Sequence, residues 1–371
     1  MRIVIRTDAS VGIGTGHVMR CLTLAECLHE RHADIAFICR ELPGNLCEVI
    51  EERGFAVHRL PSGSQEVTPQ PGDDIYTQWL GVSLKAEIRQ VRQYLARQPV
   101  RADWLIVDHY ALDAKWERQM RPEVESLMVI DDLANRPHDC DILLDQNFHA
   151  DHEPLYSGLV PPGCEMLLGP AYALLRPEFS QVRGARSIPS GQIQRVLVNF
   201  GGSDAKNETL KAIKALQKLR AARLTGDIVV GRSNPHRDQI EQLCDRNGNL
   251  RFHYDVRNMA HLMSGADLAI GAAGSTMWER CCVGLPSIMV SIAENQVAVG
   301  REAHDAGFSY FAGCSDEVSV DNLVELIGQF LQHPESVARM AGLGMAMVDG
   351  MGAGRVAEMM GVREPQPTGV I

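Results

Sequence analysis

The residues best suited to chemistry lie in one glycine-rich loop near the start of the chain, Asp8-Ala-Ser-Val-Gly-Ile-Gly-Thr-Gly-His17. Histidine exchanges protons near neutral pH, and glycines let a ligand approach the backbone closely. Arg6, Asp8 and Thr15 add more hydrogen-bonding capacity than a turn requires. We therefore predict a ligand-binding site here, with His17 as the residue best suited to proton transfer. Its expected ligand contacts are Arg6, Asp8, Gly14, Thr15 and Gly16.

Two other interpretations of the loop stay open. A dinucleotide-binding loop needs G-x-G-x-x-G and an acidic residue about twenty positions further on. Here Gly12, Gly14 and Gly16 give G-x-G-x-G, and the next strand ends in Arg40-Glu41. This disfavours a nicotinamide cofactor. The plainer alternative is a strand-to-helix turn whose histidine only caps or packs.

The elements around the loop explain why it would be a site. The apolar run 2–6 indicates a buried strand, and Val18, Leu22, Ala25 and Leu28 recur at helical spacing. The loop thus joins the carboxyl end of a strand to the amino end of a helix, where open α/β sheets bind ligands.

Further strands end in polar residues that should meet at the same edge of the sheet. Strand 103–107 is followed by Asp108 and Tyr110, strand 127–130 by Asp131-Asp132, and strand 142–144 by Asn147. Strands that alternate with helices predict a parallel sheet with helices on both faces. Asp108, Tyr110 and Asn147 are therefore added to the expected ligand contacts.

The same pattern restarts in the second half of the chain. Strand 195–200 leads to Gly201-Gly-Ser-Asp204, and strand 267–270 leads to Gly271-Ala-Ala-Gly-Ser275. Such turns before a helix direct N–H groups at an anion. With Glu279 one helical turn further on, they suggest a nucleoside diphosphate whose ribose hydroxyls meet the carboxylate. A solvent-exposed Glu279 is the alternative. The end of strand 286–292 adds two further candidates. The expected nucleotide-binding residues are Gly202, Ser203, Asp204, Gly274, Ser275, Glu279, Asn295 and Gln296.

We expect an α/β protein made of two doubly wound, Rossmann-like domains with parallel sheets that face each other across a cleft. Residues 151–190 are rich in proline, glycine and polar residues and resemble a linker. The predicted domains are therefore 1–184, with the site around His17, and 185–371, with the nucleotide site. Whether the last helix returns to the first domain is left open.

The composition limits the kinds of partner that the protein is expected to bind. A net charge of −11 over 371 residues disfavours nucleic acid or an anionic membrane. No apolar run has the length of a membrane span, and no secretory signal precedes the first strand. The ten cysteines form no C-x-x-C pair, as expected of reduced thiols in a cytoplasmic protein. We expect no metal and no cofactor; the D-x-D of Asp139 and Asp141 is too short a pattern to indicate a metal site. The oligomeric state cannot be predicted.

Several motifs together resemble a known family. Arg6-Thr-Asp-Ala-Ser10, Gly12-Ile-Gly-Thr-Gly-His-Val-Met-Arg20, Val107-Asp-His-Tyr-Ala-Leu112 and Ile130-Asp-Asp132 are similar to the PseG family, the UDP-2,4-diacetamido-2,4,6-trideoxy-β-L-altropyranose hydrolases of pseudaminic acid biosynthesis. The turns Gly201-Gly-Ser and Gly274-Ser-x-x-x-Glu279 also resemble those of the related MurG-type glycosyltransferases. The resemblance extends over nearly the whole chain.

The resemblance implies a GT-B fold that cleaves a UDP-sugar with water at the anomeric C–O bond, without a metal ion. It implies that His17 is catalytic and that the ligand contacts expected around it bind the sugar. It also implies that the nucleotide-binding set binds UDP, with the diphosphate against the glycine turns and the ribose on Glu279. Related members have an asparagine where Thr276 falls, so Thr276 is a candidate sugar contact at which this chain departs from the pattern. Two other functions stay open: an inverting GT-B glycosyltransferase that uses the same UDP-sugar, and a non-catalytic UDP-sugar-binding protein.

Overall fold

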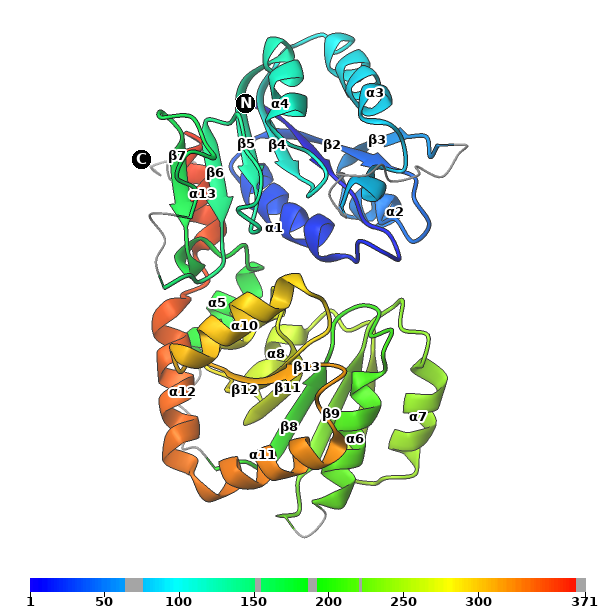
Figure 1. The fold of residues 1–371 in the computed structure, drawn as a ribbon, viewed down its shortest axis with the longest axis vertical. Helices are drawn as coiled ribbons and strands as arrows, with labels where there is room; N and C mark the ends of the chain where they lie inside the picture. The colour runs from blue at the N-terminus through cyan, green and yellow to red at the C-terminus, as the bar shows by residue number, and fades with distance from the viewer. Residues whose placement is uncertain (64–75, 151–154, 186–191, 220–221, 365–371) are drawn as a thin grey trace, which may run out of the picture. The chain divides into compact units, whose positions relative to one another are not determined.

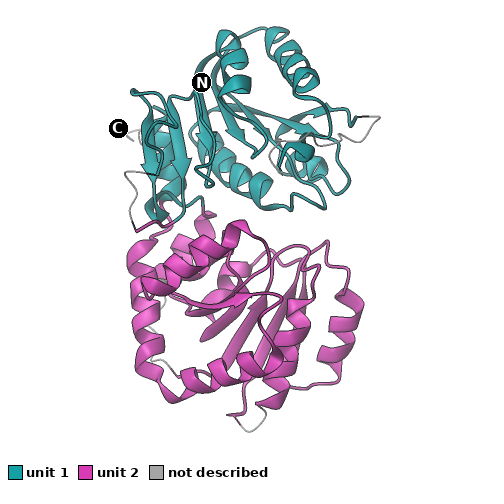
Figure 2. Cartoon of the chain, in the orientation of Figure 1, with its two compact units in different colours: residues 1–147, 151–174, 352–371 teal, residues 148–150, 175–351 magenta. Residues whose placement is uncertain are grey.

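The chain forms two compact units in the computed structural model, which describes residues 1–63, 76–150, 155–185, 192–219 and 222–364. Unit 1 comprises residues 1–147, 151–174 and 352–371, and unit 2 comprises 148–150 and 175–351 (Figure 2). The chain thus leaves unit 1 after Leu174, which lies before the boundary expected at 184/185, and its last helix belongs to unit 1. None of the helices in the described ranges combines the length and the apolar character that a membrane crossing requires.

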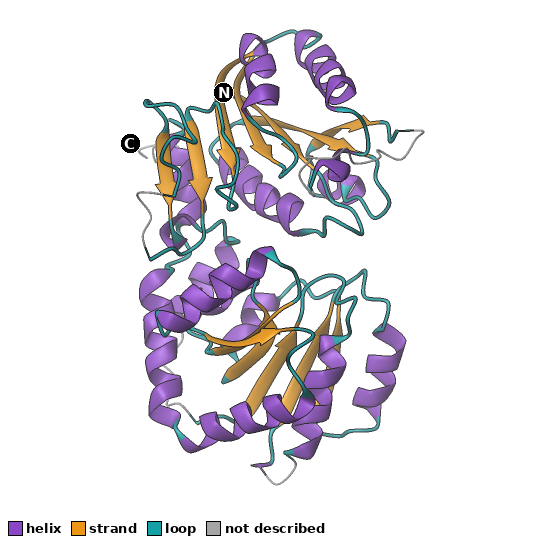
Figure 3. Ribbon diagram, viewed as in Figure 1, coloured by secondary structure: helices purple, strands orange, loops and turns teal. Residues whose placement is uncertain are grey.

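Unit 1 is a parallel sheet of seven strands in the order β3-β2-β1-β4-β5-β6-β7 (Figures 1 and 3). The strands are β1 (Arg2–Thr7), β2 (Asp34–Arg40), β3 (Ala56–Leu60), β4 (Ala102–Asp108), β5 (Val124–Ile130), β6 (Ile142–Asp145) and β7 (Glu165–Leu168). The helices are α1 (Gly16–Glu30), α2 (Cys47–Glu52), α3 (Leu84–Ala96), α4 (Ala114–Met120) and α13 (Gly352–Met359), with short 3₁₀ turns η1 (Thr77–Leu80), η2 (Arg121–Glu123) and η3 (Pro170–Tyr172).

Helices cover both faces of this sheet, and side chains along each strand alternate between the two faces. On β1, Ile3 and Ile5 pack with α1, α2 and α13, whereas Val4 packs on the opposite face with α3 and α4. The apolar residues of α1 that recur at helical spacing, such as Val18 and Leu22, are all in the first of these clusters. The expected doubly wound architecture is therefore confirmed for unit 1.

Unit 2 repeats the architecture with six parallel strands in the order β10-β9-β8-β11-β12-β13. The strands are β8 (Arg195–Asn199), β9 (Thr225–Val230), β10 (Leu250–Tyr254), β11 (Leu268–Ala272), β12 (Ser287–Ser291) and β13 (Tyr310–Cys314). The helices are α5 (Pro177–Ala185), α6 (Glu208–Lys218), α7 (Arg237–Asp245), α8 (Met259–Ser264), α9 (Thr276–Cys282), α10 (Asn295–Asp305), α11 (Val320–Gln332) and α12 (Pro334–Met347).

Strand order reverses once in each sheet, and this decides where a ligand can bind. In unit 1 the chain moves outward from β1 to β3 and then returns to place β4 on the other side of β1. In unit 2, β11 returns to the free side of β8 in the same way. The loops after these two strand pairs diverge and leave a crevice at the carboxyl edge. The glycine-rich loops predicted as sites follow β1, β8 and β11.

The interpretation of residues 151–190 as a linker was wrong for much of that stretch. Residues 165–168 form β7, the edge strand of unit 1, and residues 177–185 form α5 of unit 2. A strand of four residues beside proline-rich turns is too short to show a periodic pattern, which is why the sequence did not reveal it. Residues 151–154 and 186–191 lie outside the described residues.

Candidate functional site

The first loop folds back on itself between β1 and α1. The Gly14 N–H donates to the carbonyl of Ser10 at 2.8 Å, and an isolated bridge joins these two residues. Gly14 has a φ of 82°, a left-handed conformation that favours glycine. α1 then begins at Gly16, and the Thr15 side chain makes no capping hydrogen bond. The first N–H groups of α1 are therefore available to a ligand oxygen.

His17 is held by a carboxylate from the neighbouring strand. Its Nδ1 lies 2.6 Å from Oδ1 of Asp108, the last residue of β4. An ionised carboxylate only accepts hydrogen bonds, so Nδ1 carries the proton and donates. In a neutral ring Nε2 then carries no proton, and it makes no hydrogen bond within the described residues. A histidine oriented in this way by a carboxylate is arranged as a general base.

Arg20 fixes the same carboxylate from one turn further along α1. Its Nε donates to Oδ2 of Asp108 at 2.6 Å and its Nη2 to Oδ1 at 2.7 Å, a two-point contact. Burial would raise the pKa of Asp108, but Arg20 and His17 hold that pKa well below its usual range. Asp108 is therefore an ionised and completely buried support for His17.

Aromatic rings surround the histidine. The ring of Tyr110 lies edge-on to that of His17 at 4.6 Å, and Trp79 of η1 lies 6.0 Å away. Tyr110 donates its hydroxyl to Asp132, which also accepts from Arg20 at 2.9 Å. Burial and the charge of Asp132 raise the pKa of Tyr110 well above its usual value, so the phenol stays protonated. The base thus sits in a partly apolar setting that limits competing water.

The sequence did not predict Trp79 or the contacts that Arg20 and Asp132 make at the site. Trp79 lies in a short 3₁₀ turn between β3 and α3, where no periodic pattern marks it. Arg20 and Asp132 were visible as polar residues beside the site, at the start of α1 and after β5. Their shared contact spans 112 positions of sequence. Only the order of the strands brings them together.

Arg6 and Asp8 were expected to contact the sugar, but the structure buries both beneath the loop. Arg6 donates to Asp8 at 2.8 Å and to Glu87 of α3 at 2.7 Å, and the main-chain N–H of Arg40 donates to Asp8 at 2.6 Å. His109 also lies 3.3 Å from Asp8. With 0% and 1% of their surface exposed, Arg6 and Asp8 support the loop and do not reach a ligand in this structure.

The remaining residues predicted in unit 1 stay at the carboxyl edge. Gly16 is exposed, and Gly14, Thr15 and Asn147 are half-buried. Asn147 follows β6, two strands from β4 in the sheet, and its main-chain N–H donates to Asp145 at 2.9 Å. The loop residues and Tyr110 thus surround His17, whereas Asn147 lies further along the same edge.

In unit 2, the first glycine turn is shaped by Asp204. Its carboxylate accepts hydrogen bonds from the main-chain N–H groups of Glu208 at 2.8 Å and Thr209 at 3.0 Å, at the start of α6. Asp204 is 2% exposed, so it holds the turn instead of meeting a diphosphate directly. Gly202 and Ser203 are half-buried and remain the part of this turn that a ligand can reach.

The second glycine turn leads into α9 and carries the candidate ribose contact. Ser275 is exposed, Gly274 and Glu279 are half-buried, and the Ser275 side chain makes no capping hydrogen bond. Burial raises the pKa of Glu279 to about 7, although Arg176 at 3.7 Å acts in the opposite direction. This carboxyl group therefore changes its charge near neutral pH.

Gln296 lies just after the end of β12 and next to the second glycine turn. Its side-chain oxygen accepts from the main-chain N–H of Ile292 at 3.1 Å, and a Cβ added to Gly274 would lie 3.2 Å from its Nε2. Asn295, the first residue of α10, is exposed beside it. The residues predicted after β11 and β12 are thus adjacent at the carboxyl edge of the sheet of unit 2.

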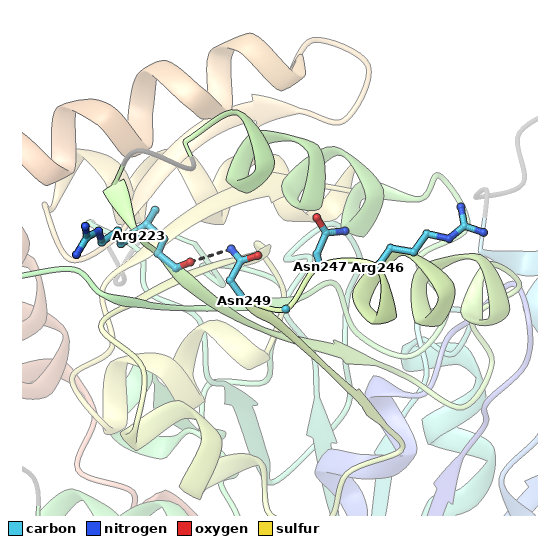
Figure 4. Close-up of a pocket in the computed structure, with 6 residues that line it drawn as sticks. Arg223, Arg246, Asn247 and Asn249 are labelled. Atoms are coloured by element: carbon cyan, nitrogen blue, oxygen red, sulfur yellow. Dashed lines mark hydrogen bonds between the residues drawn. The ribbon is translucent and has the colours of Figure 1, made fainter.

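A separate hollow of about 430 Å³ lies at the opposite edge of this sheet, before β9 and β10. It is lined by residues 223–224 and 246–249, and the side chains of Arg223 and Arg246 point away from each other (Figure 4). Because its two cations diverge, it does not form an anion site. It is also remote from every glycine turn along the strands.

The acidic pair considered for a metal, Asp139 and Asp141, is occupied by arginines. Asp139 accepts from Arg118 at 3.0 Å and from Arg121 at 2.9 Å, and Arg121 also binds Asp141 at 2.5 Å. In the described ranges, no group of three or more His, Cys, Asp or Glu side chains is placed to hold a metal ion. Metal independence stays a prediction.

Comparisons with known proteins agree with this architecture. Residues 196–344 match the family model described as the glycosyltransferase family 28 C-terminal domain, a segment that lies within unit 2. The chain is 30% identical over 314 residues to the UDP-2,4-diacetamido-2,4,6-trideoxy-β-L-altropyranose hydrolase of Campylobacter jejuni subsp. jejuni, a match that covers 84% of this chain and all of the relative.

Two solved structures show the same fold at low sequence identity. MurG from Acinetobacter baumannii superposes with a TM-score of 0.64 at 15% identity and covers 98% of this chain and 99% of its own. The spinosyn rhamnosyltransferase SpnG, complexed with thymidine diphosphate, gives a TM-score of 0.65 at 16% identity and covers 96% and 100%. These matches confirm the predicted GT-B fold.

Proposed function

The chain belongs to the family of UDP-2,4-diacetamido-2,4,6-trideoxy-β-L-altropyranose hydrolases, and we propose that it releases UDP from this sugar nucleotide with water. The observation that carries the proposal is the His17–Asp108 pair at the reversal of strand order in unit 1. It supplies a positioned base whose Nε2 is free to accept a proton. The free sugar then serves pseudaminic acid biosynthesis. The ten free cysteines suit a reducing compartment, so we expect the enzyme to act in the cytoplasm.

The reaction follows from the chemistry of the two units. His17 takes a proton from water at Nε2 while the water oxygen attacks the anomeric carbon. The bond between that carbon and the β-phosphate oxygen breaks, and its electron pair leaves with UDP. The rate therefore depends on how well water is activated and on how well the growing charge of the diphosphate is stabilised.

UDP is held by unit 2 in this proposal. The N–H groups of the two glycine turns, at Gly202, Ser203, Gly274 and Ser275, receive the diphosphate. Glu279 accepts hydrogen bonds from the ribose hydroxyls, and Asn295 and Gln296 complete the edge of the site. Support comes from the exposure of the second turn and from its place where the strand order of unit 2 reverses.

The sugar is recognised by residues of the first loop and by neighbouring strand ends. We assign its contacts to Gly14, Thr15, Gly16, Tyr110 and Asn147. Asp108 acts on the sugar only through His17. The half-buried ring of Trp79, which stacks on Tyr110, offers apolar surface to the methyl groups of a 6-deoxy, diacetamido sugar.

An inverting glycosyltransferase is the second candidate, because the model matched by unit 2 describes glycosyltransferases. Incubation with the UDP-sugar alone separates the functions. A hydrolase releases free sugar and UDP, a transferase leaves the substrate intact until an acceptor is added, and a binding protein gives no turnover. We expect full hydrolysis with EDTA present, because the candidate metal carboxylates are already paired with arginines.

We expect Glu279→Ala to weaken UDP binding by about tenfold to a hundredfold, the worth of hydrogen bonds to a charged acceptor. Since the pKa of Glu279 is raised to about 7, the carboxylate forms as the pH rises through neutrality. Wild-type affinity should therefore increase between pH 6 and pH 8, and calorimetry at several pH values measures this.

The alanine variant also separates the titration of Glu279 from the titration of UDP itself. The terminal phosphate of UDP titrates near pH 6 in both proteins, so the difference between their two pH profiles isolates Glu279. Glu325→Ala, an exposed glutamate of α11, serves as the matched substitution and should leave UDP affinity unchanged. Equal affinity of the Glu279→Ala variant and the wild type at every pH would exclude the ribose contact.

A further inference from the structure

Arg280 is a buried cation with no carboxylate partner among the residues that the structure describes. It belongs to α9 and exposes 2% of its surface. Its Nη2 donates to the carbonyl of Ala272 at 2.8 Å, and its Nη1 donates to Oγ1 of Thr276 at 3.3 Å. Its Nε is buried and makes no hydrogen bond within the same described ranges.

This isolation distinguishes Arg280 from the buried arginines of unit 1. Arg6 and Arg40 are equally buried, and each is paired with Glu87. An unpaired buried charge is unfavourable, and burial lowers the pKa of Arg280 to about 10 even though Cys281 and Glu279 act to raise it. A bound anion nearby would relieve this cost.

The guanidinium lies directly behind the second glycine turn. A Cβ on Gly271 would come within 2.9 Å of Nη1, so a glycine at this position permits the approach. Thr276, which follows the turn, uses its hydroxyl oxygen as the acceptor for Arg280. The hydroxyl hydrogen is then directed away from the guanidinium and can be donated to a ligand.

We propose that Arg280 is a resident countercharge for the diphosphate of UDP and that it orients the Thr276 hydroxyl toward a phosphate oxygen. This rests on the UDP site proposed above. Arg280 acts through the field of its charge and through Thr276, without touching the nucleotide, so it is a positioning residue. In a partly buried site such a charge is screened much less than at the surface.

The test separates the diphosphate from the nucleoside. Binding of UDP and of uridine is measured by calorimetry, with displacement for the weaker ligand. The affinity for UDP divided by the affinity for uridine reports the contribution of the diphosphate alone. We expect Arg280→Gln, which keeps N–H donors and loses the charge, to lower this ratio about tenfold or more. Arg280→Lys should restore part of it. Arg246→Gln removes an exposed cation at the opposite edge of unit 2 (Figure 4) and should leave it unchanged.

The outcomes are distinguishable. A folded Arg280→Gln variant with an unchanged ratio, or with equal losses for UDP and uridine, overturns the inference. If that variant does not fold, Thr276→Val decides, because a half-buried methyl replaces the hydroxyl. We expect it to lower the ratio severalfold, and an unchanged ratio overturns the inference. A wild-type protein that binds no UDP refutes the proposed UDP site itself, and the inference with it.

Discussion

The His17→Asn variant is expected to lose roughly two to four orders of magnitude in kcat, the usual contribution of a general base. Asparagine can still donate a hydrogen bond to Asp108 but cannot take a proton from water. UDP affinity should be unchanged, because the proposed UDP contacts all belong to unit 2. Steady-state kinetics combined with calorimetry for UDP measures both quantities.

The pH profile gives the same test independently. A protonated imidazole cannot act as a base, so the wild-type kcat should fall on acidification, and this acid limb should be absent in the variant. His29→Asn, an exposed histidine on the same helix, is the matched control and should keep a normal profile. Near-normal kcat in His17→Asn, with the acid limb still present, would show that His17 only binds the substrate.

Asp108→Asn should reduce kcat by a comparable amount, roughly two to four orders of magnitude. Arg20 donates to both oxygens of Asp108, and His17 donates to one of them. An amide has only one acceptor, so one N–H of Arg20 or of His17 must then face an NH₂ group. If the amide donates to Nδ1 of His17, the ring proton moves to Nε2 and the base is lost. Kinetics at saturating substrate measures the effect.

Stability must be followed alongside this substitution. Removing one partner of a buried ion pair costs about 3–5 kcal/mol, so a lower melting temperature is expected and kcat is referred to the folded fraction. Asp103→Asn, at the opposite end of β4, is the matched control and should leave kcat unchanged. Unimpaired kcat in a folded Asp108→Asn variant would mean that the carboxylate does not set the orientation of His17.

Local patterns were sufficient to predict the elements that carry the site. The run 2–6, the glycines up to Gly16 and the spacing of Val18 and Leu22 predicted β1, the loop and α1, because a buried strand and an amphipathic helix leave periodic marks. The glycine turns after β8 and β11 were predicted for the same reason. Parallel sheets followed from the alternation of strands and helices.

Pairing between distant charges could not be predicted in this way. Arg6 and Asp8 looked like ligand contacts because they flank a glycine loop, but Glu87 neutralises Arg6 from 81 positions away. Asp204 likewise caps α6 instead of facing the diphosphate. A polar residue at a strand end has two possible partners, a ligand or another buried charge, and only the packing of helices such as α3 decides between them.

The His17–Asp108 pair lies between these cases. Both residues were predicted at the site, but as a base and a sugar contact and not as partners 91 positions apart. Their contact depends on β4 lying next to β1, which the sequence does not state. Once the strand order is known, the end of β4 and the start of α1 are the places where side chains from the two elements can meet.

The most direct test of the central claim is hydrolysis of UDP-2,4-diacetamido-2,4,6-trideoxy-β-L-altropyranose in oxygen-18-labelled water, with EDTA present and no acceptor. The products are analysed by mass spectrometry, and UDP is the informative one because its phosphate oxygens do not exchange with water. We predict complete release of free sugar together with unlabelled UDP, since water attacks the anomeric carbon. Label in UDP would place the attack at phosphorus, and substrate that stays intact until an acceptor is supplied would identify a transferase; either result contradicts the hydrolysis proposed here.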